Sequence, residues 1–207
     1  MPNQQLIDDY VDNLVQAEGW FDDVDNDKTY GGVSTFQGVE TGFTGEPNGP
    51  QAVHKGWAYR ELKKLSEEGF DVNALDSTEG FERWHAKLID SYEANYERKG
   101  LKPLPRHTVY RLVDLFVKWL RVYRKEYPAV VAAIKRHAHV VLNEPNRNLI
   151  SEIIDDCPPY GSSTQSTEGA VRSYNDIQNK VRVFCQQRGG SPIIVDVWAR
   201  NRNHSGE

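Results

Sequence analysis

The sequence predicts a mainly α fold of the α+β class, with helices along most of the chain and one short β-hairpin near the N-terminus. Apolar residues recur three and four positions apart over most of the 207 residues, which is the spacing that buries one face of a helix. Residues that begin and end helices, mainly Ser, Asp, Pro and Gly, stand at the borders of these segments. One glycine-rich stretch, 30–41, instead contains a run in which apolar and polar residues alternate. This stretch is the expected hairpin.

The composition is that of a globular protein with a generous polar surface. Hydrophobic residues make up 38% of the chain, and the mean hydropathy is -0.67. No apolar run has transmembrane length, and the N-terminus is acidic and polar, unlike a signal peptide. We therefore expect a protein that stays in the cytoplasm until another factor releases it. We expect a helical domain at 1–155, a polar linker at 156–168 and a helical extension at 169–207.

The first expected helix starts near Leu6 and has an apolar face that includes Leu14. Continuing that face by four residues leads to Glu18, just before the helix ends at Gly19. Burial disfavours the charged form of a carboxyl group and raises its pKa, so Glu18 is a candidate general acid. The alternative is that Glu18 caps the helix end or forms an ion pair there.

Acidic residues at alternate positions follow this helix and resemble the start of a calcium-binding loop. An EF-hand that begins at Asp23 requires Gly at its sixth position and Glu at its twelfth. Those positions hold Lys28 and Ser34, so the EF-hand is excluded. The pattern leaves open a looser calcium site and a solvated acidic turn.

The rest of the chain reads as helices separated by short loops. The segment 109–127 is apolar on more than one face, which predicts the most buried helix. The segment 193–200 follows a Ser-Pro start signal, but its β-branched residues make a strand the alternative. The remaining helices are expected at 52–69, 79–99, 129–142, 146–155 and 170–187, and the apolar stripe of 79–99 is Phe81, Trp84, Leu88, Tyr92 and Tyr96.

The stretch from Glu18 onward resembles the N-terminal signature of a known enzyme family. It reads Glu-Gly-Trp-Phe at 18–21, an Asp-rich turn, Gly-Gly at 31–32 and Thr-Phe-Gln-Gly-Val at 35–39. The phage and bacterial muramidases of the lysozyme-like glycosyl hydrolase family 108 read Glu-Gly-Gly-Tyr, a turn, and Gly-Gly-x-Thr-Asn-Tyr-Gly-Ile. This chain departs from that pattern at Trp20, at Phe-Gln in place of Asn-Tyr, and by one additional residue before the Thr.

The resemblance implies a lysozyme-like helical domain and a peptidoglycan hydrolase, an N-acetylmuramidase of the endolysin type that cleaves β-1,4 glycosidic bonds. In this reading Glu18 is the general acid, Asp27 is the second carboxylate, and Thr35 orients a water molecule. The chemistry needs two carboxyl groups and requires no metal and no cofactor.

A sugar-binding cleft also needs groups that contact the substrate, and exposed aromatic faces are typical of such clefts. Trp20 and Tyr30 would offer aromatic faces to a sugar chain, and Gln37 stands within the motif. Asp114 matches the Asp of a second family motif, Phe-Asp-x-x-Val-Asn, although Lys118 stands where that motif has Asn. The alternative for Asp114 is a structural pairing with Arg111, with Lys118 or with the cap of a neighbouring helix.

The charge distribution supports a second class of function. Residues 1–50 hold ten acids and one base, whereas residues 101–150 hold ten bases and three acids. An acidic pole and a basic pole would give the molecule an electric dipole, which would orient it on an anionic polymer such as peptidoglycan, teichoic acid or nucleic acid. The alternative is that these charged residues only cover solvent-exposed faces. The rival to the enzyme is a non-catalytic helical protein of phage or defence origin, whose basic segment 106–147 contacts nucleic acid or a protein. Its aromatic residues are Tyr110, Trp119 and Tyr123.

Cysteine and histidine spacing does not predict a metal site. Cys157 and Cys185 are expected to be two thiols, because a disulfide between them would require an oxidising compartment. His137 and His139 are two positions apart and would point to different faces of the expected helix.

Overall fold

The computed structural model describes residues 49–67, 70–160 and 166–205 and six isolated positions before them. The isolated positions are Tyr10, Asn13, Leu14, Ala17, Gly19 and Lys28. Within these residues the protein is mainly helical and contains no strand, which confirms the expected mainly α class. The expected hairpin at 30–41 lies outside the described residues.

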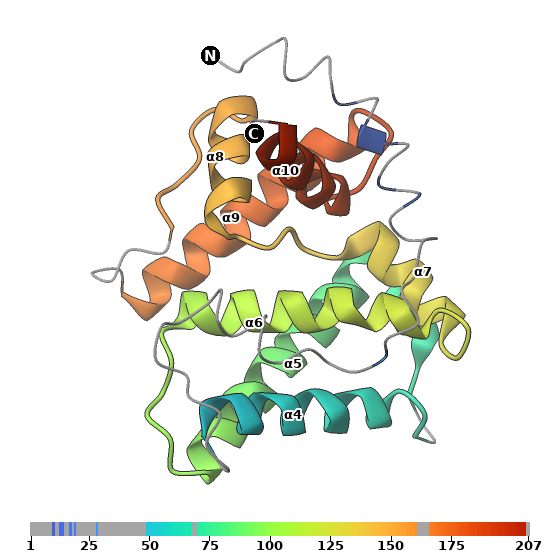
Figure 1. The fold of residues 1–207 in the computed structure, drawn as a ribbon, viewed down its shortest axis with the longest axis vertical. Helices are drawn as coiled ribbons and strands as arrows, with labels where there is room; N and C mark the ends of the chain where they lie inside the picture. Colours follow the sequence, from blue (N-terminus) through green and yellow to red (C-terminus); the bar gives the residue numbers. More distant parts are fainter. Residues whose placement is uncertain are drawn as a thin grey trace. The chain divides into compact units, whose positions relative to one another are not determined.

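The described helices follow one another with short connections (Figure 1). Two of them, η1 and η2, are short 3₁₀ helices, and the others are α-helices. The bounds are α4 Pro50–Lys64, η1 Val72–Asp76, α5 Thr78–Arg98, α6 Arg106–Trp119, η2 Leu120–Tyr123, α7 Pro128–His137, α8 Glu144–Ile153, α9 Thr167–Gln186 and α10 Ile193–Ser205.

Polar side chains start several of these helices by binding backbone N–H groups that have no partner within the helix. The Ser77 hydroxyl accepts a hydrogen bond from the Gly80 N–H at 3.0 Å at the start of α5. Ser166 caps α9 in the same way, and the Asn143 side chain caps α8. Gly100, which follows α5, has a φ of 66°, a conformation that glycine adopts without strain.

The chain forms two compact units. One unit comprises Met1–Val24 and Lys135–Glu207, and the other comprises Asp25–Ile134. The C-terminal helices therefore share a unit with residues that the sequence assigns to the main domain. We refer to the two as the terminal unit and the central unit.

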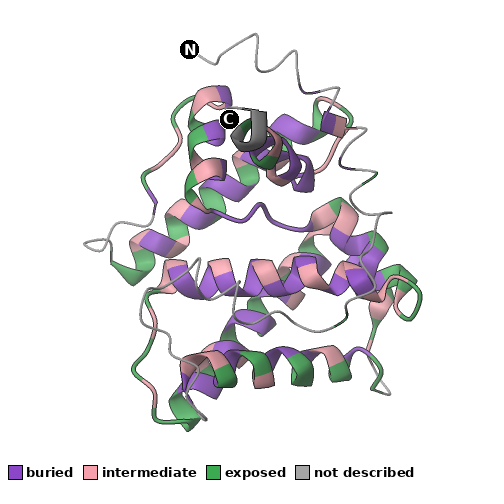
Figure 2. Ribbon diagram, viewed as in Figure 1, coloured by how far each residue is buried: buried purple, intermediate pink, exposed green. Residues whose placement is uncertain are grey.

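Three helices build the core of the central unit. Helix α5 packs against α4 and α6, and buried residues recur along α6 (Figure 2). The Trp57 ring joins the three helices, because it makes edge contacts with Tyr92 at a centroid distance of 4.9 Å and with Phe116 at 4.8 Å. The burial of α6 on more than one face confirms the expectation for this segment. The α-helix in this segment ends earlier than the expected position 127: α6 ends at Trp119, and the chain goes on as the 3₁₀ helix η2.

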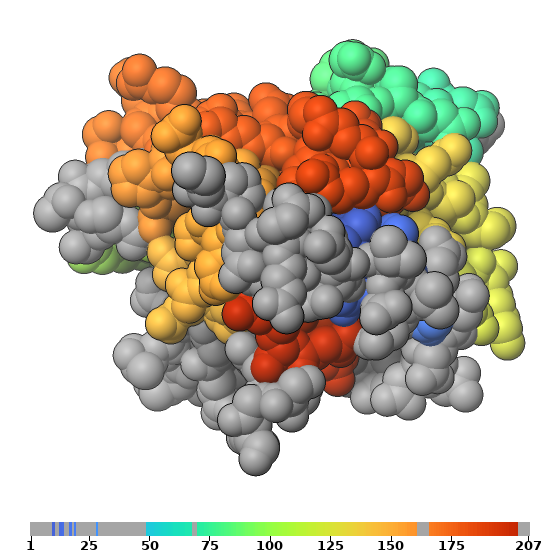
Figure 3. All heavy atoms as spheres, turned by 90° about the horizontal axis from the view of Figure 1, so that it is seen from above, coloured from blue at the N-terminus to red at the C-terminus, as the bar shows by residue number. Residues whose placement is uncertain are grey.

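The terminal unit packs its described N-terminal residues against α9 and α10 (Figure 3). The Tyr10 ring meets Phe184 and Trp198 edge-on, at centroid distances of 5.7 and 5.9 Å. Gly190, in the turn between α9 and α10, permits this approach: a Cβ atom there would lie 2.2 Å from the Tyr10 hydroxyl and 2.8 Å from Leu14. Helix α10 confirms the helical reading of the segment that begins at Ile193.

Helix α7 ends at His137, five residues before the expected end at Leu142. The residues that follow are extended and buried, and side chains from elsewhere in the terminal unit satisfy their backbone groups. Gln178 bonds both the N–H and the C=O of Val140, and the Asp196 carboxylate accepts from the Val141 N–H at 3.2 Å. These partners make the extended chain more stable than another turn of helix.

No helix among the described residues is both long enough and apolar enough to cross a membrane.

Candidate functional site

Six of the seven sequence-predicted site residues lie outside the described residues, so the structure does not place them. They are Glu18, Trp20, Asp27, Tyr30, Thr35 and Gln37. The described residues on either side of Glu18, namely Ala17 and Gly19, are both helical, and Gly19 is the position at which the first helix was expected to end. Ala17 is buried and Gly19 is exposed.

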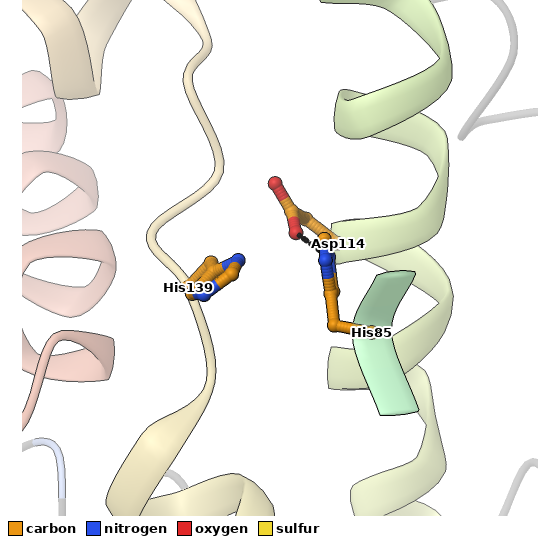
Figure 4. Close-up of side chains that lie close together, drawn as sticks. All are labelled: His85, Asp114 and His139. Atoms are coloured by element: carbon orange, nitrogen blue, oxygen red, sulfur yellow. Dashed lines mark hydrogen bonds and ion pairs between the residues drawn. The ribbon is translucent and has the colours of Figure 1, made fainter. Parts of the chain in front are cut away.

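The seventh residue, Asp114, lies on α6 and is only 2% exposed. The imidazole N–H of His85, on α5, donates to its carboxylate with 2.8 Å between Nε2 and Oδ1 (Figure 4). The His85 ring lies parallel to the Tyr110 ring at a centroid distance of 6.3 Å. The sequence alternative named Arg111, Lys118 or the cap of a neighbouring helix; the partner shown here, His85, does lie on a neighbouring helix, but in its interior and not at its cap.

The His85–Asp114 pair ties α5 to α6 inside the central unit. A carboxylate that fixes an imidazole also occurs in catalytic sites, where the ring must reach a reacting group. His85 is 3% exposed, so the pair is shielded from solvent on both sides. Its clear chemical effect is a charge-assisted hydrogen bond between two helices. Substrate binding by Asp114 stays a prediction and would require a path from solvent to the carboxylate.

A cavity of about 350 Å³ opens between α4, η1 and α5, entirely within the central unit. Its floor includes Glu61, and its walls include two cations of α5, Arg83 and Lys87. The lining also includes Lys64, Asp71 and Trp84. The volume falls within the range of about 300–1,000 Å³ typical of small-molecule sites. Among the described residues, this cavity combines a volume of this size with several charged side chains and an aromatic one, which makes it a candidate site.

A chain of hydrogen bonds fixes Glu61 in the cavity floor. The residue is 8% exposed, and its Oε1 atom accepts from the Ser91 hydroxyl and from Lys64 Nζ, the latter at 2.8 Å. The Trp57 indole N–H in turn donates to the Ser91 oxygen at 3.1 Å. The carboxylate is thus held in one orientation by groups from α4 and α5. Its second oxygen, Oε2, makes no hydrogen bond within the described residues.

The walls of the cavity are equally well fixed. Gly80 lies so close to η1 that a Cβ atom there would stand 1.5 Å from the Ala74 carbonyl oxygen. The Asp71 carboxylate accepts from the backbone N–H groups of Asn73 and Ala74, which holds the first turn of η1. The cavity is therefore bounded by packed backbone rather than by side chains alone.

Sequence reasoning did not find this cavity, although one signal was present. Trp57, Glu61 and Leu65 are four residues apart, so an acid interrupts an apolar stripe, as Glu18 does in the first helix. The same logic that selects Glu18 selects Glu61. Trp84 was expected in the core, but it is partly exposed and lines the cavity.

Two further buried groups have environments that alter their chemistry. His54 on α4 is fully buried, and desolvation lowers its pKa to about 3, so the ring is neutral near neutral pH. Cys185 on α9 is also fully buried, and burial raises the pKa of its thiol to about 12. Both cysteines are free thiols.

The chain matches no protein-family model, no curated protein and no solved structure. The resemblance to muramidases therefore rests on the sequence alone, chiefly on residues 18–39 and more weakly on the motif around Asp114.

Proposed function

We propose that the chain is a peptidoglycan hydrolase of the lysozyme-like type, an N-acetylmuramidase that cleaves β-1,4 glycosidic bonds. The observation that carries the proposal is the sequence pattern at 18–39: Glu-Gly followed by aromatic residues, an Asp-rich turn, Gly-Gly and a Thr. The proposal includes the finer fold that goes with it, a lysozyme-like helical domain with a hairpin at 30–41.

Glu18 protonates the glycosidic oxygen as the bond to the leaving sugar breaks. Asp27 either stabilises the positive charge that develops on the sugar ring or activates water together with Thr35. Trp20, Tyr30 and Gln37 contact the sugar chain, and Asp114 is the remaining substrate-binding candidate. The two carboxyl groups and a water molecule supply all the proton transfers that this hydrolysis needs.

The described structure supports the proposal in one respect: the fold is mainly helical, as the family resemblance implies. Two described residues that precede Glu18 in the sequence, Tyr10 and Ala17, are buried, at 1% and 4% exposure.

The test compares the clearing of a purified peptidoglycan suspension by wild type and by Glu18→Gln. The amide keeps the shape of the side chain but cannot donate the proton, so we expect clearing by wild type and a loss of at least a hundredfold in the variant. The matched control is Glu67→Gln, which changes an exposed acid beyond the end of α4 and should clear normally.

Product analysis separates a muramidase from other peptidoglycan hydrolases. Cleavage of the proposed bond creates one new reducing end for each bond broken and releases no free amino groups. A well-folded wild type that produces no reducing ends at any pH from 4 to 9 would contradict the enzymatic proposal. Clearing that is equally strong in Glu18→Gln would refute the assigned acid.

The second candidate function is ligand binding without catalysis. The sequence placed this role on the basic segment 106–147, but Lys118 and Tyr110 of that segment are only 7% and 6% exposed. Contact of this segment with an anionic polymer stays a prediction. The observation that favours a binding role is instead the α4–η1–α5 cavity with its two cations.

A further inference from the structure

We propose that the α4–η1–α5 cavity of the central unit binds a nucleoside phosphate. This inference rests on the geometry of the cavity and is independent of the proposed hydrolase activity, whose residues lie elsewhere in the sequence. The argument uses the charge of the walls, the position of an aromatic ring and the carboxylate in the floor.

The walls offer two positive charges that the described residues leave uncompensated. Arg83 and Lys87 are exposed residues one turn apart on α5, and both line the cavity. Neither forms an ion pair or a hydrogen bond with any described residue, although Glu79 and Asp90 lie one turn away from them on the same helix. Two such cations match the charge of a phosphate monoester, which is close to -2 at neutral pH.

The acidic groups of the cavity do not cancel this charge. Lys64 neutralises Glu61 through their 2.8 Å contact. Asp71 Oδ1 accepts from two backbone N–H groups of η1, which stabilise its negative charge without removing it. The charged lining residues are the cations Lys64, Arg83 and Lys87 and the anions Glu61 and Asp71, so the cavity keeps one net positive charge, and its two cations without a partner among the described residues lie on α5.

Trp84 adds a flat apolar surface beside the cations. It follows Arg83 directly in α5, so its side chain leaves the helix about 100° further round, and both side chains line the cavity. The Trp84 ring is held edge-on to Phe81 at a centroid distance of 5.4 Å. A ligand that uses both features needs an anionic group and a planar ring within one small molecule. Aromatic stacking of a base contributes about 1–3 kcal/mol, which is enough to select a nucleoside over a bare phosphate.

The floor of the cavity supplies a hydrogen-bond acceptor for the ring. Ser91 and Lys64 occupy Oε1 of Glu61, and Oε2 has no partner among the described residues. A carboxylate oxygen held in this way accepts a hydrogen bond from the exocyclic amino group of a base, as it does from cytosine in nucleic-acid recognition. The preferred ligand therefore carries an amino-bearing base, and the uracil nucleotide should bind less tightly.

The experiment is calorimetric titration of the full chain at low salt with AMP, adenosine, ribose 5-phosphate and UMP. We expect AMP to bind at one site and each of the other three to bind at least tenfold more weakly. Titration with a short single-stranded oligonucleotide, with and without a 5′-phosphate, distinguishes a free nucleotide from the end of a nucleic acid as the source of the same chemistry.

The variants assign each contact. Arg83→Gln and Lys87→Gln should each weaken AMP binding about tenfold and leave adenosine binding almost unchanged, because only AMP carries the phosphate. Trp84→Leu should weaken AMP and adenosine alike. The matched control is Lys55→Gln, which removes an exposed cation of α4 that does not line the cavity, and its AMP binding should equal that of wild type.

Two outcomes would overturn the proposal. One is the absence of saturable AMP binding to folded wild type. The other is equal binding of AMP and ribose 5-phosphate with no effect of Trp84→Leu, which would reduce the cavity to a general anion site. Glu18→Gln should bind AMP as tightly as wild type does. AMP binding and peptidoglycan clearing are separate measurements, so the failure of one proposal can be distinguished from the failure of the other.

Discussion

The side-chain amide of Gln178 bonds both backbone groups of Val140, accepting from its N–H at 3.0 Å and donating to its C=O at 2.8 Å. One side chain thereby replaces the neighbouring strand that an extended segment normally requires. Val140 is fully buried and Gln178 is 2% exposed, so water cannot substitute for either bond.

Gln178→Leu should therefore destabilise the protein. The variant leaves the N–H and the C=O of Val140 buried without partners, at a cost of about 3 kcal/mol. Denaturant unfolding measures the loss. The control is Gln186→Leu, at the exposed end of α9, which should change the free energy of unfolding by less than about 0.5 kcal/mol. A Gln178→Leu variant as stable as wild type would show that the extended segment does not depend on this amide.

His85 and Asp114 should show strong energetic coupling. We expect a double-mutant cycle with His85→Phe and Asp114→Leu to give a coupling energy of about 2 kcal/mol, because each single change leaves its partner buried without this hydrogen bond. His85→Phe retains a ring beside Tyr110 and limits the loss of packing. Asp90→Leu, at an exposed position of α5, is the control partner and should give no coupling with His85→Phe. Additive effects of the two buried changes would contradict the pairing.

The burial of His54 makes stability depend on pH. Its folded pKa of about 3 lies below the ordinary value of 6.5, so the unfolded chain binds the proton first as the pH falls. Between pH 7 and pH 5 the free energy of unfolding should therefore fall by about 2 kcal/mol because of this group alone. His54→Phe keeps an aromatic ring against Trp57 and removes the titrating group. The free energy of unfolding of this variant should therefore fall less than that of wild type between pH 7 and pH 5, by about 2 kcal/mol. Unfolding free energies of both proteins at the two pH values test this, and parallel losses would contradict it.

Gly190→Ala should destabilise the terminal unit. The new Cβ atom would meet the Tyr10 hydroxyl at 2.2 Å and Ile194 Cδ1 at 2.3 Å, and relieving this contact should cost about 1–3 kcal/mol. The matched control is Gly56→Ala in α4, where the nearest atom is the Arg60 guanidinium at 3.5 Å. Because Ala favours a helix interior over Gly by about 1 kcal/mol, that control should be stabilised. Thermal unfolding of the two variants should thus move in opposite directions, and a shift in the same direction would refute the close contact.

The two thiols should differ in reactivity. Cys185 is fully buried with its pKa raised to about 12, whereas Cys157 is half-buried. A thiol reagent should modify one cysteine in the native protein and both in denaturant. In Cys157→Ser the native protein should not react. Rapid modification of that variant would mean that the α9 thiol is accessible.

The sequence was most informative where structure is set locally. Ser77 and Gly100 mark the start and end of α5, and both signals stand directly at the borders of the helix in the sequence. The end of α7 could not be found in this way, because Gln178 and Asp196, which hold the extended segment, lie far along the chain. The strand alternative at Ile193 failed for a related reason: the consecutive residues Ile193, Ile194 and Val195 are all buried, on more than one face of a helix, because tertiary packing surrounds it.

The candidate sites show the same limit. Glu61 was visible as an acid in an apolar stripe, but its partners on α5 depend on how two helices pack. His85 occupies an apolar stripe between Phe81 and Leu88, which indicates burial without identifying Asp114 as its partner. Spacing predicts which face of a helix is buried, and it does not predict which two faces meet.

The contact of Asn13 with Asn201 joins positions 188 residues apart, by a hydrogen bond of 3.1 Å. Tyr10 likewise meets α9 and α10, which a ribosome synthesises last among the described helices. During translation Tyr10 and Asn13 therefore leave the ribosome long before the helices that they contact, and these contacts form only after both α9 and α10 have been synthesised.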